Sequence, residues 1–264
     1  MSSVVTLMSD FGTADGYAAA MKGVLLSACR EVVVVDATHE IPPQDVRAGA
    51  WALRRYWNLF PKGTVHVAVV DPGVGSSRKP LLIRADGRWL LGPDNGLFSW
   101  VLREARSWTA WKIAPSTRRP GGVGETFHGR DVFAYAAGLL ASGAPRERLA
   151  RVEVEPVRFA WPTPRRARGE IRGEIVHLDH FGNAVSNIPA ALVSWPRRSV
   201  SVECGSFGVE SLSASYASAR AGRPVAVVES SGLVELSVNG GSAAESFSLA
   251  IGAAVRIWSA SCSR

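Results

Sequence analysis

Runs of β-branched residues alternate with helix-forming segments in the first part of the chain, and this alternation constrains the fold more than any other feature. EVVVVDAT (31–38) and TVHVAVVD (64–71) are rich in valine, as expected of strands that are covered on both faces. Between them, PQDVRAGAWALRRYWNLF (43–60) places apolar residues at helical spacing. Repeated strand–helix–strand units predict an N-terminal α/β domain with a mostly parallel sheet.

The pattern of apolar and polar residues changes after about residue 168. From there the chain consists of short, alternating segments separated by glycines, which indicates a small all-β barrel or sandwich. We therefore expect two domains, an α/β domain over residues 1–165 and a C-terminal β-barrel domain over residues 166–264.

The charge leaves one class of partner to consider. The chain carries 30 lysines and arginines against 23 acidic residues, a formal charge of +7, which nucleic-acid-binding proteins also show. The densest basic stretch, TPRRARGEIRGE (163–174), contains Pro164 and Gly169, which favours a linker over a recognition helix. We favour the simpler explanation, in which arginine-rich composition is spread over the surface without a nucleic-acid partner.

Other features bear on location. No apolar run reaches the roughly 18–20 residues that a membrane span requires, and the N-terminus has no signal-peptide pattern. The three cysteines, Cys29, Cys204 and Cys262, are far apart and odd in number, which argues against a disulfide framework. We expect a cytoplasmic protein with no membrane partner.

Acidic residues follow the predicted strands. Asp10, Asp36 and Asp71 come at or near the ends of the first three, and α/β sheets bind ligands at the carboxyl ends of their strands. The sequence contains neither GxGxxG nor a Walker motif, so a standard dinucleotide or P-loop site is not expected. Asp10, in SDFGTADGY (9–17), suits either ribose hydroxyls or a turn.

The stretch VVDPGVGSSRKP (69–80) stops a buried strand at Asp71 and follows it with a glycine-rich turn and Arg78. Glycines let the backbone approach a ligand closely, although an Asp–Arg pair across a turn can also be purely structural. ETFHGRD (125–131) places His128 where a helix begins, which fits either a packed or a catalytic histidine.

The C-terminal half offers two weaker candidates. LDHFGNAVSN (178–187) combines Asp179, Phe181 and Asn183, and an amide and a ring suit a nucleobase, whereas an ordinary Asx-turn would use the same residues. SSGLVELSVNGGSA (230–243) carries Glu235 on a strand that small polar residues flank.

These motifs occur together and in one order, from LMSDFG through DATHEI, FPKGTVHVAVVDPGVG, GPDNGL, TFHGRD and DHFGN to SVNGGSA. In this combination the sequence resembles the S-adenosylmethionine hydroxide adenosyltransferases, relatives of fluorinating and chlorinating enzymes that cleave the same substrate. The resemblance implies an α/β domain followed by a β-barrel. It also implies attack of water or hydroxide on C5′ of S-adenosylmethionine, which gives adenosine and L-methionine.

The resemblance also implies site residues. The hydrolytic Asp–Arg–His set falls on Asp71, Arg78 and His128. No metal and no cofactor are implied, and the family assembles as a homotrimer with sites between subunits. The substrate-binding positions implied are Asp10, Asp179, Phe181, Asn183, Ser230, Glu235, Val238 and Asn239.

The halogenating relatives differ at these positions. They carry tyrosine at the position of Asp71 and tyrosine–serine at His128–Gly129, and they have an insertion that KPLLIRADGRWLLGPDNG leaves no room for. They also carry a basic residue at the position of Ser231, so that contact to the methionine carboxylate does not carry over. The resemblance therefore favours the hydrolytic branch over a halogenase.

Two other classes of function remain open from the residues alone. A metal-dependent hydrolase could use Asp71, His128 and Asp131, although no HxxxH, HxH or paired-carboxylate spacing supports it. A basic nucleic-acid-binding protein would be the other, although no recognised module is present.

Overall fold

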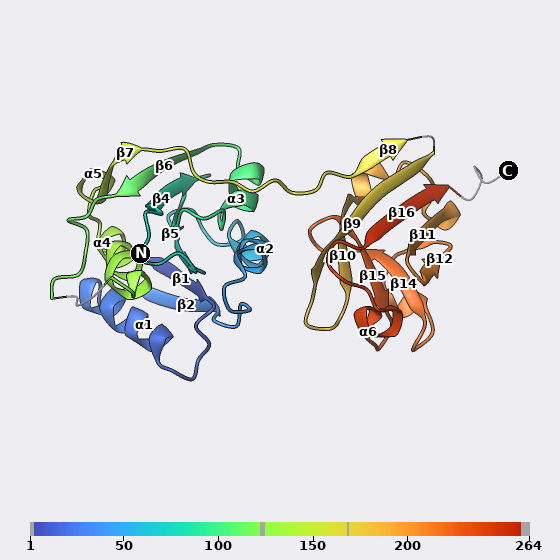
Figure 1. The fold of residues 1–264 in the computed structure, drawn as a ribbon, viewed down its shortest axis with the longest axis horizontal. Helices are drawn as coiled ribbons and strands as arrows, with labels where there is room; N and C mark the ends of the chain where they lie inside the picture. Colours follow the sequence, from blue (N-terminus) through green and yellow to red (C-terminus); the bar gives the residue numbers. More distant parts are fainter. Residues whose placement is uncertain (1–2, 122–124, 168, 260–264) are drawn as a thin grey trace. The chain divides into compact units, whose positions relative to one another are not determined.

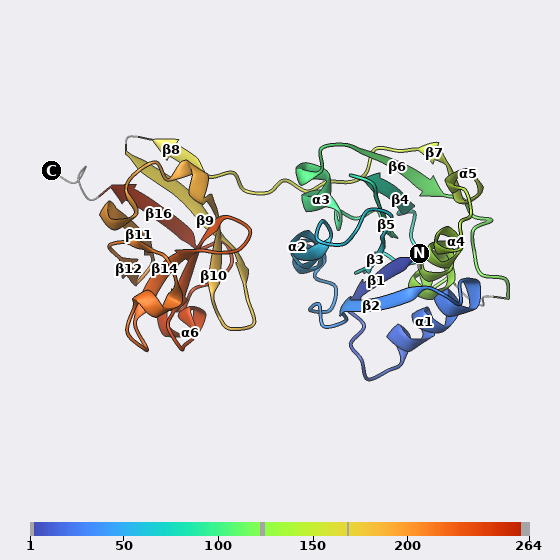
Figure 2. The ribbon, with the colours of Figure 1, turned by 180° about the vertical axis from the view of Figure 1, so that it is seen from behind.

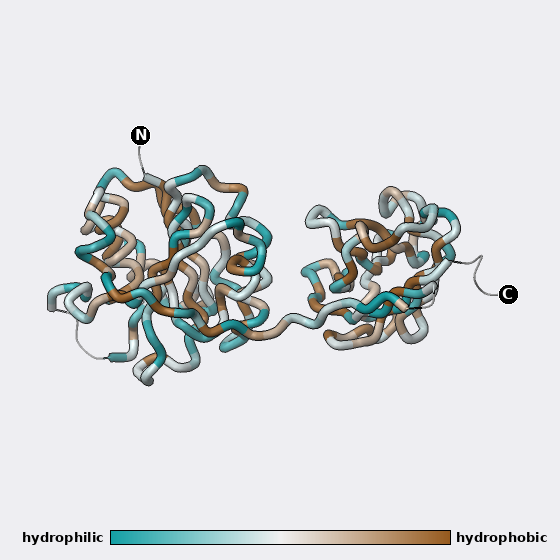
Figure 3. Tube along the Cα trace, turned by 90° about the horizontal axis from the view of Figure 1, so that it is seen from above, coloured by the Kyte–Doolittle hydropathy of each residue, from teal (hydrophilic) through white to brown (hydrophobic). Residues whose placement is uncertain are grey.

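The computed structural model describes residues 3–121, 125–167 and 169–259, and the chain divides into two compact units, Met1–Phe159 and Ala160–Arg264. The boundary expected between residues 165 and 166 stays a prediction. Figure 3 shows hydrophobic residues concentrated along the inner strands of each unit. No helix in the described ranges is both long and apolar enough to span a membrane.

The N-terminal unit is a sheet with helices on both sides (Figure 1). Its elements are β1 (Val4–Ser9), α1 (Tyr17–Ala28), β2 (Val33–Thr38), α2 (Val46–Tyr56), β3 (Val65–Val69), β4 (Pro80–Ala85), β5 (Arg88–Pro93), α3 (Ser99–Glu104), β6 (Trp108–Ile113), the π-helical η1 (Gly129–Ala134), α4 (Tyr135–Ala141), α5 (Arg146–Leu149) and β7 (Ala150–Glu153).

The seven-stranded sheet of this unit is mixed, so the expected mostly parallel sheet is not confirmed. Its order is β2-β1-β3-β5-β4-β6-β7. The β2/β1, β1/β3 and β3/β5 pairs are parallel, whereas β5/β4, β4/β6 and β6/β7 are antiparallel. The change of direction comes from the β4–β5 hairpin, which turns at Asp86 and Gly87 with φ of 44° and 82°.

β3 occupies the centre of the parallel part, and all five of its residues are buried. The prediction of a covered valine-rich strand is therefore confirmed for β3. It is wrong for β2, which lies at the edge of the sheet and leaves Val33 48% exposed. Asp36 lies within β2 rather than after it, so of the three predicted acidic residues Asp10 and Asp71 are the two that follow a strand.

Helix packing on the two faces follows the alternation of side chains along the strands. Figure 2 shows α1 and α4 on one side of the sheet and α2 and α3 on the other. α1 contributes Met21 and Leu25 to the first face, and α2 buries Trp51 and Leu53. α2 begins after Asp45, whose carboxylate accepts the Ala48 N–H at 2.9 Å, an ordinary N-cap.

The C-terminal unit is one strongly curved, nearly barrel-shaped sheet with a short helix (Figure 1). Its elements are β8 (Arg165–Ala167), β9 (Glu170–Leu178), β10 (Ala184–Pro189), η2 (Ala190–Leu192), η3 (Arg197–Ser199), β11 (Val200–Cys204), β12 (Phe207–Val209), β13 (Leu212–Ser213), η4 (Tyr216–Ser218), β14 (Pro224–Val228), β15 (Leu233–Val238), α6 (Ala243–Phe247) and β16 (Ala254–Ser259). The strand order is β12-β11-β16-β9-β10-β15-β14-β13, and β8 pairs with β9.

The structure also tests the predictions for the basic stretch and for the cysteines. The prediction of a linker at 163–174 is wrong, because β8 and β9 pair antiparallel within this stretch, with Arg165 opposite Arg172. Cys29 and Cys204 are free thiols, and Cys262 lies outside the described residues.

Gly92 lets β5 lie close to β3, the strand that leads to Asp71. A Cβ at Gly92 would lie 2.2 Å from the Ala68 carbonyl oxygen and 2.9 Å from Cζ of Phe98. We predict that Gly92→Ala lowers the free energy of unfolding by about 1–3 kcal/mol, because overpacking forces backbone to move.

Urea unfolding would measure this effect. Gly208→Ala is the matched control, since a Cβ there meets nothing within 4 Å and it should stay within about 1 kcal/mol of wild type. Equal stability of the two variants would contradict the packing argument.

Candidate functional site

The turn after β3 brings Arg78 back onto Asp71. The Val74 N–H donates to the Asp71 carbonyl at 3.2 Å, and the Ser76 N–H donates to the Gly73 carbonyl at 3.1 Å. Gly75 has φ of 80°, a conformation that side chains disfavour, so the glycine is needed for this turn.

Arg78 and Asp71 form a two-pronged, nearly buried ion pair. Arg78 Nε donates to Asp71 Oδ1 at 2.9 Å and Nη2 donates to Oδ2, while the two side chains are only 8% and 6% exposed. Paired geometry of this kind fixes the plane of the carboxylate. Nη1 of Arg78 is buried and has no hydrogen-bond partner among the residues described.

His128 contacts the same guanidinium nitrogen that binds Oδ2 of Asp71. Its Nδ1 is 2.7 Å from Nη2 of Arg78, and because arginine only donates, Nδ1 must be the acceptor. The neutral ring therefore carries its proton on Nε2, which lies 3.5 Å from Oε2 of Glu125. Hydrogen bonds from Arg118 and then from His128 hold the pKa of Glu125 below its usual range.

A pocket of about 470 Å³ opens beside this set. Three rings in it pack edge to face, with centroids 5.9 Å apart for Phe11–Tyr17, 5.7 Å for Phe11–Phe127 and 5.4 Å for Tyr17–Phe127. A Cβ at Gly129 would lie 3.2 Å from the Phe11 ring, so glycine is what lets this ring approach. The lining residues are Phe11, Tyr17, Val69, Asp71, Val74, Thr126, Phe127, His128, Gly129 and Arg130.

Asp10 follows β1 directly, and its carboxylate is already engaged. Oδ2 accepts the Gln44 backbone N–H at 2.8 Å. Asp10 is not among the residues that line the pocket beside Asp71. The N-terminal unit therefore brings Asp71, Arg78 and His128 together and holds Asp10 by a separate contact.

The C-terminal unit brings three predicted residues into one turn between β9 and β10. Asp179 Oδ1 accepts the N–H groups of Phe181 and Asn183 at 2.9 and 2.8 Å, and Oδ2 accepts the Asn183 side-chain amide at 2.9 Å. This is the Asx-turn that the sequence left open, and it fixes the amide. Phe181 is 73% exposed, so its ring is presented on the surface of this unit.

Glu235 lies inside the same unit and is only 3% exposed. The hydroxyls of Tyr216 and Ser237 each donate to its Oε1 at 2.8 Å. Burial raises the pKa of Glu235, and the negative charges of Asp179 and Glu229 add to this. Burial also raises the pKa of Tyr216 to about 12.

The remaining predicted positions lie around β15. Ser230 donates to Oε2 of Glu229 at 3.4 Å, Val238 is buried, and the Asn239 amide donates to the Ala219 carbonyl at 2.7 Å. These contacts stay within the C-terminal unit.

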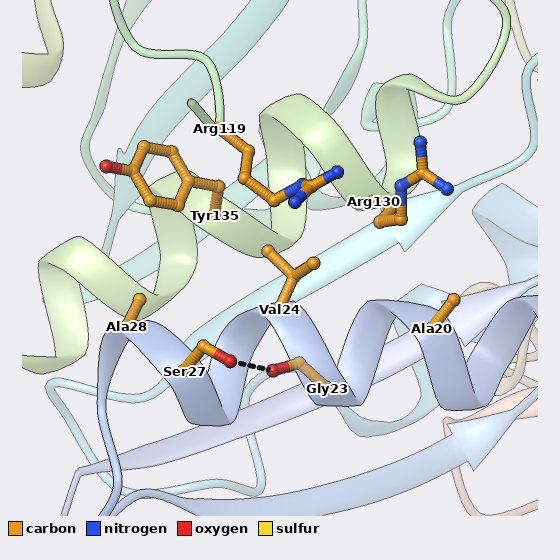
Figure 4. A pocket seen from close by; sticks show the side chains of 8 residues that line it. All are labelled: Ala20, Gly23, Val24, Ser27, Ala28, Arg119, Arg130 and Tyr135. Atoms are coloured by element: carbon orange, nitrogen blue, oxygen red, sulfur yellow. Dashed lines mark hydrogen bonds between the residues drawn. The ribbon is translucent and has the colours of Figure 1, made fainter. Parts of the chain in front are cut away.

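A second pocket, of about 390 Å³, lies between α1 and the η1–α4 segment (Figure 4). Arg119 and Arg130 line it, and both donate to the carboxylate of Asp131, which is fully buried. No predicted site residue lines this pocket. Asp131 therefore anchors two arginines.

Sequence reasoning missed several residues of the first pocket. Phe11, Tyr17 and Phe127 lie in the motifs SDFGTADGY and ETFHGRD, which also contain polar candidates. Their position near those candidates in the sequence could have identified them. Glu125 could be found in the same way, three residues before His128. Within the described ranges, no three His, Cys, Asp or Glu side chains gather as a metal site.

Comparisons with known proteins agree with one another. The protein-family model for the SAM hydroxide adenosyltransferase N-terminal domain matches residues 5–150, and the family model for the C-terminal domain matches residues 173–256. The chain is 41% identical to an (R)-S-adenosyl-L-methionine hydrolase of Thermus thermophilus, over 96% of this chain and 98% of that protein. It is 37% identical to one of Salinispora arenicola, over 96% and 97%.

More distant relatives include a fluorinase of Actinopolyspora mzabensis, 30% identical over 96% of both chains. Among solved structures, an uncharacterized conserved protein from Thermotoga maritima superposes with a TM-score of 0.88 at 28% identity, over 96% of this chain and 99% of that one. With both domain models matched in order, the chain belongs to the SAM hydroxide adenosyltransferase family.

Proposed function

We propose that the protein is an S-adenosyl-L-methionine hydrolase, in which water attacks C5′ and adenosine and L-methionine leave. The observation that carries this is the bridge that Arg78 makes between Asp71 and His128 at the edge of the 470 Å³ pocket. The names of the relatives that cover almost the whole chain support it.

The leaving group needs no general acid from the protein. As the water oxygen bonds to C5′, the C5′–S bond breaks and its electron pair stays on sulfur, so a neutral thioether leaves without an acid. The difficult part is the nucleophile, because bulk water has a pKa of about 15.7. A positioned base typically contributes about 10²–10⁴-fold to the rate.

We assign the proton acceptor to Asp71. Nδ1 of His128 accepts from Arg78 and Nε2 carries the ring proton, so the neutral imidazole has no lone pair to offer in this arrangement. Each Asp71 oxygen uses one lone pair toward Arg78 and keeps another for water. His128 then acts by fixing the guanidinium that holds Asp71.

Substrate binding is assigned by the motifs. Asp10 would accept the ribose hydroxyls, while Asn183 and Phe181 would meet the adenine. Asp179 and Ser230 would meet the amino-acid end. The adenosine side would be lined by Glu235, Val238 and Asn239, although the buried position of Glu235 also suits a structural role.

The other features of the proposal come from the family and the composition. We propose a cytoplasmic homotrimer that needs no metal and no other cofactor, and that acts without nucleic acid or membrane. S-adenosylmethionine is its substrate, and adenosine is the product expected to bind.

The first prediction is the reaction. Incubation of the purified protein with S-adenosylmethionine should release adenosine and methionine in equal amounts, as measured by chromatography. Excess fluoride or chloride should give no 5′-halo-adenosine, because the Asp71 carboxylate lines the pocket. S-adenosylhomocysteine as product, or halo-adenosine in quantity, would count against it.

The second prediction separates chemistry from binding. Asp71→Asn keeps the shape but removes the charge, and it should lower kcat by about 10²–10⁴-fold. His128→Ala should lower kcat by at least about tenfold, and both variants should bind adenosine almost as wild type does.

Asn183→Ala is the reciprocal variant. It should weaken adenosine binding, by roughly fivefold for one lost hydrogen bond, and change kcat less. Wild-type kcat in both Asp71→Asn and His128→Ala would show that the Asp71–Arg78 pair is only turn structure.

A further inference from the structure

Three side chains at the ends of β1 and β2 form a chain of hydrogen bonds away from the pocket. Ser9 Oγ lies 2.7 Å from Nδ1 of His39, and Nε2 of His39 lies 3.1 Å from Oδ1 of Asp36. Lys22 of α1 pairs with the other oxygen of Asp36. We call Ser9, His39 and Asp36 the β1–β2 polar chain.

The direction of the hydrogen bonds follows from the charge on Asp36. Burial opposes its ionisation, but hydrogen bonds from Lys22 and His39 hold the pKa of Asp36 below its usual range. The carboxylate only accepts, so Nε2 of His39 donates to it, and in the neutral ring Nδ1 accepts from the Ser9 hydroxyl. The Ser9 oxygen in turn accepts the Phe11 N–H at 3.3 Å.

Ser, His and Asp are also the residues of a nucleophilic triad, but the burial here excludes that role. Ser9 is fully buried and His39 is 4% exposed. Ser9 does not line the pocket beside Asp71, and its hydroxyl is engaged on both sides. The chain therefore ends on the backbone of Phe11, not on a substrate.

The segment that carries His39 is joined to the same turn by three more contacts. The Gly12 N–H donates to the His39 carbonyl at 2.8 Å, and the Ile41 N–H donates to the Ser9 carbonyl at 3.4 Å. The Gln44 N–H donates to Oδ2 of Asp10 at 2.8 Å.

Gln44 is a second, independent sign of constraint. Its φ is 66°, a left-handed conformation that a residue with a Cβ disfavours. Backbone strain of this kind persists only where the surroundings enforce it, and here it aims an N–H at the Asp10 carboxylate.

We propose that the β1–β2 polar chain is a positioning device that fixes the Asp10 carboxylate and the Phe11 ring for binding of the nucleoside ribose. This inference rests on the proposed function, in which Asp10 accepts the ribose hydroxyls. Among the described residues, the hydrogen bonds and ion pairs of Ser9, His39 and Asp36 do not include Asp71, Arg78 or His128, so we expect their removal to affect nucleoside recognition more than water attack.

The test compares adenosine with 2′-deoxyadenosine by calorimetric titration of the full chain. A hydroxyl bound by a charged carboxylate is worth about 1.5–3 kcal/mol, so wild type should prefer adenosine by roughly 10–150-fold. His39→Leu keeps much of the side-chain volume but removes the hydrogen bonds of the β1–β2 polar chain. It should lower the preference for adenosine over 2′-deoxyadenosine to within about threefold, while kcat changes less than KM.

Conservative and control variants separate positioning from general damage. His39→Asn keeps a polar atom near the position of Nδ1 and should restore part of the preference. Ser9→Ala, a smaller change, should act in the same direction as His39→Leu. Glu40→Ala, at the exposed neighbour of His39, should leave the preference as in wild type.

The outcomes distinguish the two hypotheses. A wild-type protein that releases no adenosine from S-adenosylmethionine overturns the proposed function. An active wild type whose His39→Leu and Ser9→Ala variants keep the full preference for adenosine overturns the positioning role alone. Equal weakening of the binding of both nucleosides would also overturn it, because such a loss does not depend on the 2′-hydroxyl and would indicate general damage to the protein.

Discussion

One guanidinium, that of Arg78, is the constraint on which the proposed catalytic site depends. It holds both oxygens of Asp71 and donates to Nδ1 of His128, and its side chain is only 8% exposed. Removing one partner of a buried pair typically costs about 3–5 kcal/mol, because the other charge is left unpaired. The turn through Gly75 brings Arg78 back to Asp71, and His128 lies directly before η1.

The parallel part of the sheet places Asp10 and Asp71 at the same edge. β1 and β3 are neighbours, so Asp10 and Asp71 follow strands that end at the same edge. Each carboxylate is then oriented differently: Asp71 by an arginine, Asp10 by the backbone N–H of a strained Gln44. Arg78 thus fixes the plane of the Asp71 carboxylate, and the Gln44 N–H fixes one oxygen of the Asp10 carboxylate.

Much of this could be predicted from the sequence, and the failures have physical reasons. Valine runs predicted β2 and β3, but the position of a strand at the edge of a sheet is a tertiary property, so the exposure of β2 could not be predicted. The antiparallel β4/β6 and β6/β7 pairs join segments that are distant in the sequence, so they were not predicted from local pattern. Motif resemblance suggested Asp71, Arg78 and His128, and the structure brings them together. The tautomer of His128 and the Asp36–His39–Ser9 contacts depend on distances, which a sequence does not contain.

Water labelled with ¹⁸O tests the central claim most directly. When the protein turns over S-adenosylmethionine in this water, mass spectrometry should find one ¹⁸O in adenosine, at the 5′ oxygen, and none in methionine, because water attacks C5′ and the C5′–S bond breaks. Unlabelled adenosine, or label in the amino-acid product, would contradict attack of an Asp71-held water at C5′.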